Sequence, residues 1–533
     1  MGMTKGQFSV LSFAAIAALS ASGAAFAQAE PPIQRGGTAI LTLTQEPPTL
    51  NPVITSGVPD RTMGCILYEP LIQVTPEYKI QPVLAKSYTI SPDGLTYTFE
   101  LNKANWHDGK PFTSDDVKYS ILEGSVKYGT VFAAAGKEIE SIETPAPDKV
   151  IFKLKQTFGP FLLSLACSQG GAILPAHVFR GTEIPKNPAT TATPIGTGAF
   201  KLGEWKRGEY VKVVKNTDYF IPGKPYLDAV IGKIITQTGA RIQALQGGEV
   251  DIVSNIAAND IAAINANPKL KVLNSDTSSQ SGIMMYNQRR KPLDDKRVRQ
   301  ALFIATDRDY LMKNVFFNVG TIGTQPMTTD IPWLSNPDVD YRKMYPYDIA
   351  KANALLDAAG AKRGADGKRM TLKMLTFGFD YPEMQQAAIA MKSMWQAVGV
   401  DMQIEGLERT AFIQKVFKEY DYDITMQVYG SFYDPALGIA RTWATSSQGD
   451  QFGNPMGYSN PKLDELFEKG KRGTSFDERG VFYKQAQAIL ADELPSLQLR
   501  QYVFIDAASK RLHGVWGKMQ STAGLWSEAW LEQ

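Results

Sequence analysis

Apolar and polar residues alternate along several short segments of the chain. In residues 95–101, LTYTFEL, every second side chain is apolar. This period of two predicts a strand with one apolar face. Residues 150–154 follow the same pattern, and residues 39–43 and 423–430 are predicted as further strands, the second of them buried.

The second half of the chain alternates strand and helix patterns. Residues 372–376 are predicted as a strand, residues 383–398 as an amphipathic helix that Gly399 ends, and residues 401–405 as the next strand. A further helix is predicted over residues 477–491. This strand–helix–strand order is typical of a parallel α/β layer.

Residues 93–120 read DGLTYTFELNKANWHDGKPFTSDDVKYS and combine two turns, a strand and a helix start. The helix start is predicted at residues 113–116, where hydroxyl side chains precede two acids that the helix dipole favours. This stretch resembles the signature of the family 5 extracellular solute-binding proteins. These are the periplasmic dipeptide, oligopeptide and nickel receptors of ABC importers.

Three later segments resemble further motifs of that family, in the family's order. They are PIGTGAFKL from Pro194, LQGGEVDI from Leu245 and PLDDKRVRQAL from Pro292. In the family the third segment marks the crossover into a second lobe. A collinear series of motifs is more specific than any single match.

The resemblance implies an α/β, two-lobe periplasmic-binding-protein fold with a hinge. Lobe I is expected to be discontinuous, formed by residues 31–283 and 501–533, and enlarged by an extra subdomain at about residues 60–180. Lobe II is expected to span residues 284–500. A chain of 533 residues is also too long for one ordinary core.

Composition excludes some classes of protein. The chain is 44% hydrophobic and 21% charged, which is ordinary for a soluble globular protein. The formal net charge is only +2, so nothing favours nucleic-acid binding. Ligand choice must then depend on local groups, because the overall field is weak.

The first residues are predicted to be a secretory signal peptide that covers residues 1–27. Lys5 precedes an apolar run too short to span a membrane, and Ala25-Phe26-Ala27 is a typical cleavage site. The alternative is a short N-terminal membrane helix. No cysteine follows the run, so a lipid anchor is not expected. We expect export to the periplasm of a Gram-negative cell.

The chain contains two cysteines, Cys65 and Cys167. An oxidising compartment permits a disulfide between them. Both lie in apolar surroundings, so two buried free thiols remain the alternative. Neither cysteine lies near a histidine in a pattern that indicates a nucleophile or a metal site.

No catalytic constellation is visible in the sequence. The three histidines are scattered, and the metal-binding and hydrolase motifs H-E-x-x-H, C-x-x-C and G-x-S-x-G are absent. Gly196 and Gly198 lack the Lys-Ser/Thr of a phosphate-binding loop. We therefore predict no catalytic residue, no metal site and no cofactor.

Asp434 is the main candidate for ligand contact. It follows the strand predicted at residues 423–430, and open α/β sheets bind ligands at the carboxyl ends of strands. The resemblance implies that this aspartate pairs with the α-ammonium group of a peptide. The alternative is a helix N-cap, because Asp before Pro435 suits a helix start. Other candidates are aromatic or polar residues near the same loop, the predicted crossings or the first turn: Tyr433, Phe432, Tyr429, Trp443, Asn287, Arg289, Glu46 and Trp526.

These observations predict a monomeric solute receptor that delivers short peptides to the permease and ATPase of an ABC importer. On the same scaffold the ligand could instead be an opine, a sugar, an aromatic solute or a nickel chelate, since fold does not settle function. A secreted hydrolase is the alternative from another class, although no motif supports it.

Overall fold

The computed structural model describes residues 31–55, 57–75, 79–129, 132–274, 280–377, 382–515 and 526–533. The predicted signal peptide lies outside the described residues. Residues 31–33, which precede the main unit, contain no helix or strand. Gln34–Gln533 form one compact unit, and three sheets carry most of its architecture.

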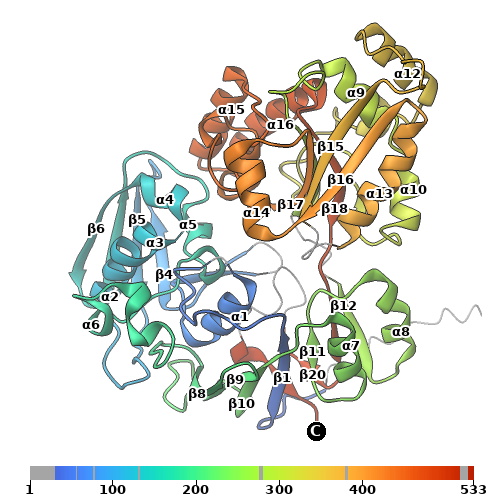
Figure 1. The fold of residues 1–533 in the computed structure, drawn as a ribbon. Helices are drawn as coiled ribbons and strands as arrows, with labels where there is room; N and C mark the ends of the chain where they lie inside the picture. The colour runs from blue at the N-terminus through green and yellow to red at the C-terminus, as the bar shows by residue number, and fades with distance from the viewer. Residues whose placement is uncertain are drawn as a thin grey trace, which may run out of the picture. The chain divides into compact units, whose positions relative to one another are not determined.

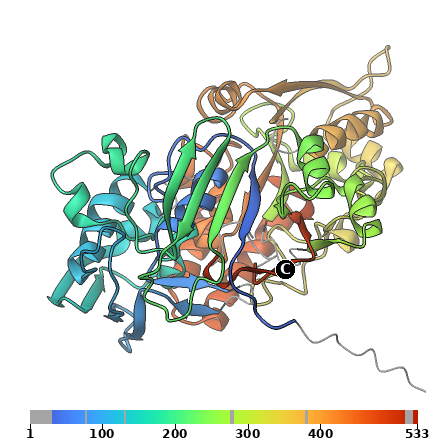
Figure 2. The same cartoon turned by 90° about the horizontal axis from the view of Figure 1, so that it is seen from below.

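Seven strands from both ends of the chain form one mixed sheet. Strand β1 lies at its centre, parallel to β10 and β11, whereas β9 and β19 run antiparallel to their neighbours. Figure 2 shows the blue strand β1 beside the green strands of this sheet. The strand predicted at residues 39–43 is confirmed as β1. The order across the sheet is β12 (Leu270–Asn274), β19 (Ile505–Ser509), β11 (Ile252–Val253), β1 (Thr38–Leu43), β10 (Ala229–Ile234), β9 (Tyr210–Lys215) and β8 (Phe200–Lys206).

A four-stranded antiparallel sheet lies within the residues predicted as the extra subdomain. Every second residue of β5, beginning with Tyr97, is buried, as the alternation predicted. The helix start is confirmed too: α2 (Ser114–Tyr119) begins after Thr113, whose backbone N–H donates to Asp116 Oδ2 at 2.9 Å. The order across the sheet is β4 (Ala85–Ile90), β5 (Thr96–Leu101), β7 (Lys149–Leu154) and β6 (Ile139–Ala146).

Six strands form the third sheet, which is also mixed. The predicted parallel layer is confirmed, since β15 pairs in parallel with both β16 and β17. Helix α13 (Pro382–Gln396) connects β15 to β16 and packs on both, as Figure 1 shows in orange. The order across the sheet is β14 (Thr321–Ile322), β18 (Ser496–Tyr502), β13 (Gln280–Tyr286), β17 (Ile424–Gly430), β15 (Met370–Phe377) and β16 (Val400–Leu407).

Helices cover both faces of this sheet. One face carries a core to which Trp395 of α13 belongs, and the other carries a core to which Tyr483 of α16 belongs. The helix predicted at residues 477–491 is confirmed as α16, and Ser475 caps it by accepting the N–H of Glu478 at 3.2 Å. The main helices are α9 (Lys296–Ile304), α10 (Arg308–Asn314), α12 (Ile349–Ala358), α13, α15 (Pro461–Arg472) and α16 (Phe476–Glu493).

The chain passes between the seven-stranded and six-stranded sheets twice. The first passage joins β12 to β13, and the second joins β18 to β19 through residues 503–504. The predicted lobe boundaries fall inside β13 and β18, both of which belong wholly to the six-stranded sheet. The division into lobes at those residues stays a prediction.

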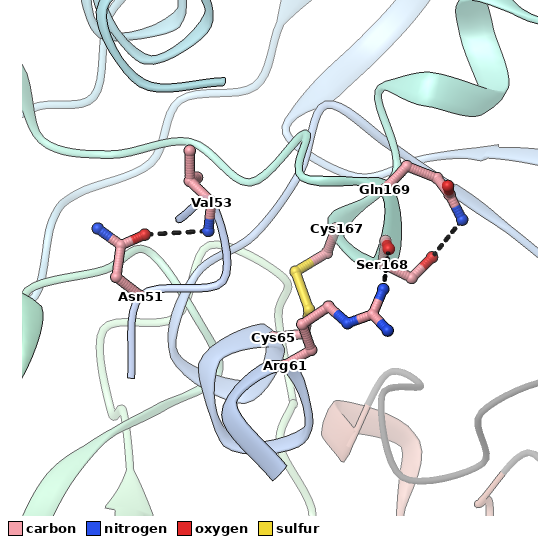
Figure 3. Close-up of a disulfide and its surroundings, with 7 residues drawn as sticks. All are labelled: Asn51, Val53, Arg61, Cys65, Cys167, Ser168 and Gln169. Carbon is pink, nitrogen blue, oxygen red and sulfur yellow. Dashed lines mark hydrogen bonds between the residues drawn. A yellow bond between two sulfur atoms is a disulfide. The ribbon is translucent and has the colours of Figure 1, made fainter. Parts of the chain in front are cut away.

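A disulfide joins Cys65 of α1 (Val58–Leu67) to Cys167, 102 residues later in the sequence. Figure 3 shows the bond beside Arg61, whose Nη1 donates to the carbonyl oxygen of Ser168 at 2.7 Å. Both cysteines belong to the core that packs against the seven-stranded sheet. Of the two alternatives left by the sequence, the bonded form is the one found.

Candidate ligand-binding site

The carboxyl ends of the parallel strands point toward the two passages. In the six-stranded sheet, Gly430 at the end of β17 lies opposite Gln280 at the start of β13, and β13 also pairs with Tyr502 at the end of β18. In the seven-stranded sheet, β11 and β12 both pair with β19. The carboxyl end of β11 therefore lies near Asn274 of β12 and Ile505 of β19. Open α/β sheets place ligands outside these ends.

The loop after β17 has an unusual backbone. Phe432 and Tyr433 are consecutive residues with φ of 47° and 73°, a region that residues with a β-carbon seldom adopt. Such conformations cost about 1–3 kcal/mol each and cluster at functional sites. Tyr433 is buried and Phe432 is half-buried, and both pack against the core of the four-stranded sheet. The loop therefore joins two parts of the molecule.

Asp434 is fully buried and has internal partners. One oxygen accepts the N–H of Ala436 at 3.0 Å and Arg479 Nη2 at 2.7 Å, and the other lies 2.6 Å from Arg479 Nη1. The helix-cap alternative is thus the arrangement found, since Asp434 caps the 3₁₀ turn Pro435–Leu437. This corrects the expected geometry, because the carboxylate directs both oxygens at Arg479. Its contact with a ligand ammonium group stays a prediction without support from the structure.

Arg479 is held as firmly as its partner. Its Nε donates to the carbonyl oxygen of Gly470 at 2.6 Å, and its guanidinium carbon lies 5.2 Å from the ring centre of Trp333. Burial lowers the pKa of Arg479, but the charge of Asp434 and its hydrogen bonds outweigh that effect and raise the pKa above its usual value. Arg479 therefore keeps its positive charge. Nothing in the local sequence pattern indicated this partner.

Two aromatic candidates belong to a core. Tyr429 and Trp443 are buried among apolar side chains on one face of the six-stranded sheet. Trp443 Nε1 donates to Ser496 Oγ at 2.9 Å, which fixes its ring. The Tyr429 hydroxyl is buried and finds no hydrogen-bond partner among the described residues. A role for Trp443 in ligand contact would require a change in this packing.

Asn287 and Arg289 lie at the edge of the sheet opposite the loop after β17. Strand β13 starts at the passage and ends with Tyr286 opposite Ile424, at the other edge. Asn287 Nδ2 donates to the carbonyl oxygens of Tyr420 and Tyr422, and Arg289 Nη1 donates to that of Pro455 at 2.8 Å. Seven strand residues separate the two edges by roughly 20 Å. The structure therefore does not bring these two residues together with Asp434.

The remaining two candidates belong to the seven-stranded part. Glu46 follows β1 at the expected edge, but its oxygens accept Trp205 Nε1 at 2.8 Å and the N–H of Gly208 at 2.7 Å. These bonds fix the first loop to the turn between β8 and β9. Trp526 is buried in the core around the disulfide. Ligand contact by either residue stays a prediction.

Comparison with known families decides the relationship. The model of the bacterial extracellular solute-binding proteins, family 5 Middle, matches residues 79–451. The chain belongs to the family 5 solute-binding proteins. The resemblance seen in residues 93–120 is thereby confirmed.

Curated relatives of this family 5 protein include receptors for peptides. A Brucella ovis protein named as an ABC transporter peptide-binding protein is 33% identical over 340 residues, and the match covers 63% of the chain and 62% of the relative's length. The oligopeptide-binding protein AppA of Bacillus subtilis is 26% identical over 87% of the chain and 86% of AppA. The glutathione-binding protein GsiB of Escherichia coli is 28% identical, and the match covers 88% of the chain and 90% of GsiB.

Solved structures confirm the periplasmic-binding-protein fold. Bacillus subtilis AppA in complex with a nonapeptide has a TM-score of 0.79 at 25% identity, and the match covers 94% of the chain and all of AppA. AgaA from Agrobacterium tumefaciens R10 in complex with agropinic acid has a TM-score of 0.78 at 26% identity, and the match covers 93% of the chain and 99% of AgaA.

Two features are absent from the described residues of this family 5 protein. Within the described ranges, no three His, Cys, Asp or Glu side chains lie together as a metal site requires. No helix in the same ranges has the length and apolarity to cross a bilayer.

Proposed function

We propose that this protein is the periplasmic receptor of an ABC importer and binds short peptides at the carboxyl ends of its two large sheets. It releases them unchanged to a permease and ATPase complex in the inner membrane, and it acts as a monomer. The observation that carries this proposal is the family match, combined with the passages of the chain that bring both sets of carboxyl ends to one region.

The mechanism follows from the two passages. A ligand that contacts both sheets favours the arrangement in which they lie closest, and it can shift the equilibrium only by its differential affinity for that arrangement. Backbone groups of a peptide offer hydrogen bonds that do not depend on side-chain identity. We place Phe432 at the ligand-binding site because it lies in the loop that follows the carboxyl end of β17 and its side chain is half-buried.

An opine is the second candidate ligand. The AgaA structure contains agropinic acid and matches 93% of this chain. An opine and a peptide both carry carboxylate groups beside amine or amide nitrogens. The same pocket chemistry would therefore serve either.

Isothermal titration calorimetry on the mature protein tests the proposal. The panel contains peptides of two to nine residues, glutathione, agropinic acid, neutral sugars and nickel–histidine. We expect saturable binding of at least one peptide and its recovery unchanged by mass spectrometry. Binding restricted to a non-peptide ligand, or conversion of the peptide, would refute the peptide-receptor proposal.

A matched pair of variants tests the placement of the site. Phe432→Ala should weaken peptide binding about tenfold, or about 1.4 kcal/mol. Tyr310→Ala, an exposed aromatic of α10, should leave the affinity unchanged. Equal affinities for the two variants would show that the loop after β17 does not contact the ligand.

A further inference from the structure

Arg441 is the exposed residue of an otherwise buried segment. It lies in the 3₁₀ turn Ile439–Thr442, which follows the Asp434 loop directly. Of the residues from Ser431 to Thr442, Arg441 alone is exposed. Its guanidinium makes no ion pair and no hydrogen bond to the described residues, although most other arginines of the chain have such partners. A charged group that chain folding leaves unpaired in this position is available to a ligand.

The surroundings of Arg441 enclose it partly. The surrounding protein desolvates the guanidinium and lowers its pKa, and Tyr429 and then Asp450 partly offset that effect. The side chain is thus accessible to solvent and yet has protein on several sides. An enclosed charge interacts more strongly with an opposite charge than one in bulk water does.

Two buried hydroxyl groups at the end of β17 and in the loop after it have no partner among the described residues. The Tyr429 hydroxyl is buried without a partner, and Arg441 is the charged group that lowers its pKa against the effect of burial. Ser431 Oγ, two residues further along in the loop after β17, is also buried without a partner among the described residues. Buried polar groups without partners are rare and call for an explanation.

The local charge is positive. Asp434 is neutralised by Arg479 through contacts at 2.6 and 2.7 Å, so it does not offset Arg441. Asp450 is exposed and acts on Arg441 only at a distance. A ligand that approaches the loop after β17 therefore meets an unpaired cation and no free carboxylate within that loop.

We propose that Arg441 binds a carboxylate group of the ligand, so that this receptor selects its cargo by an acidic group near the loop after β17 and not by an ammonium group at Asp434. The proposal rests on the receptor function proposed above and narrows its ligand class. A guanidinium presents two parallel N–H donors that match the two oxygens of a carboxylate.

The test compares ligands that differ in one charge. The probes are trialanine, trialanine amide, N-acetyltrialanine, glutathione and agropinic acid, each titrated into the wild-type mature protein by calorimetry. We expect amidation of the carboxylate to weaken binding at least tenfold. Acetylation of the amino group should change the affinity less than threefold.

Variants of Arg441 test whether this residue causes the dependence of binding on the ligand carboxylate. Arg441→Gln should weaken binding of the carboxylate probes at least tenfold and should remove the difference between trialanine and its amide. Arg441→Lys keeps the positive charge but loses the two parallel N–H donors. Its affinity for the carboxylate probes should lie between those of wild type and Arg441→Gln. Arg180→Gln, an exposed arginine paired with Asp115 elsewhere, serves as the control and should bind like wild type.

Each outcome decides the inference. Equal binding of the acid and the amide, or wild-type affinity in Arg441→Gln, would overturn it, as would failure of every carboxylate probe to bind. If agropinic acid binds and depends on Arg441 while no peptide binds, the inference stands and the peptide proposal falls. If peptides bind but acetylation of the amino group weakens binding more than amidation of the carboxylate does, the peptide proposal stands and this inference falls.

Discussion

Asp434 and Arg479 form an ion pair from which water is almost completely excluded. Both atoms of the guanidinium fork lie within 2.7 Å of carboxylate oxygens, and the two side chains are 0% and 1% exposed. The pair connects the loop after β17 to α16, and Arg479 also reaches the end of α15 through Gly470. The residue expected to contact the ligand instead fixes the loop that carries Phe432 and Arg441.

Removing one partner of this pair should destabilise the fold strongly. Arg479→Met leaves a buried carboxylate without its counter-charge, and we expect a loss of about 3–5 kcal/mol in the free energy of unfolding. Urea denaturation of the mature protein measures it. Glu183→Gln breaks an exposed pair with Lys186 and should cost less than about 1 kcal/mol.

The double variant separates charge from packing. If the charge is the cause, Asp434→Asn combined with Arg479→Met should cost less than the sum of the two single changes. Additive losses would contradict this account, because they would indicate independent packing defects.

Local patterns in the sequence were enough to predict several of the strands and helices. The alternation in residues 95–101 and the helical period in residues 383–398 lie within single short windows, and they became β5 and α13. The position of Asp434 after a buried strand was also predicted from the sequence. Its partner was not, because Arg479 lies 45 residues further along the chain and only tertiary packing brings them together.

Strand direction explains why Asn287 and Arg289 lie apart from Asp434. Asn287 and Arg289 were candidates because they follow the predicted first crossing of the chain between the lobes. Because β13 is antiparallel to β17, the two carboxyl ends lie at opposite edges. Arg441 did have a local signal, since it is the only charged residue between Pro435 and Ser447. Without the structure, a missing ion-pair partner could not be recognised.

The disulfide should contribute measurably to stability. Cys65 and Cys167 close a loop of 102 residues, and cross-links of such loops restrict the unfolded chain. We expect a reducing agent to lower the free energy of unfolding by roughly 2–4 kcal/mol. The variant with both Cys65→Ala and Cys167→Ala should match the reduced wild type and should not respond to the agent. An equal response of both proteins would indicate an effect unrelated to this bond.

Stability should depend on pH through a buried acid, Glu69. Its side chain is 3% exposed, one oxygen accepts the Tyr219 hydroxyl at 2.8 Å, and burial raises its pKa from 4.5 to about 7. Between pH 4.5 and 7 the folded state holds a proton that the unfolded state has lost. The stabilisation is therefore complete below pH 4.5 and is lost as the pH rises to 7.

Replacing this acid removes that pH dependence. Glu69→Gln keeps a group that can accept the Tyr219 hydroxyl and cannot ionise. Relative to wild type, the variant should gain about 3 kcal/mol between pH 4.5 and pH 8, measured by urea denaturation at each pH. Glu249→Gln, which replaces an exposed acid, should follow the wild-type curve. Parallel curves for wild type and Glu69→Gln would show that Glu69 does not hold a proton in the folded state.

Arg472, the last residue of α15, connects that helix to the four-stranded part of the chain. Its Nη1 lies 2.7 Å from Glu138 Oε2 and donates to the carbonyl oxygen of Thr157 at 3.1 Å. Beside it, the N–H of Gly159 donates to the carbonyl oxygen of Lys471 at 2.9 Å. The N–H of Gly159 can exchange with solvent only when this contact opens, so its exchange rate reports the free energy of opening.

Arg472→Ala should therefore accelerate hydrogen exchange at Gly159. Loss of a partly buried ion pair and its hydrogen bond should lower the free energy of opening by about 1.4 kcal/mol, which corresponds to tenfold faster exchange. Mass spectrometry of a peptide spanning residues 155–161 measures it. Glu465→Gln changes a charge on α15 that pairs with the exposed Lys462 and Lys469 of the same helix, and it should leave the rate unchanged. Unchanged exchange in Arg472→Ala would mean that other contacts set the free energy of opening, such as the apolar packing of Tyr433 and Leu437 against the core that contains Phe161.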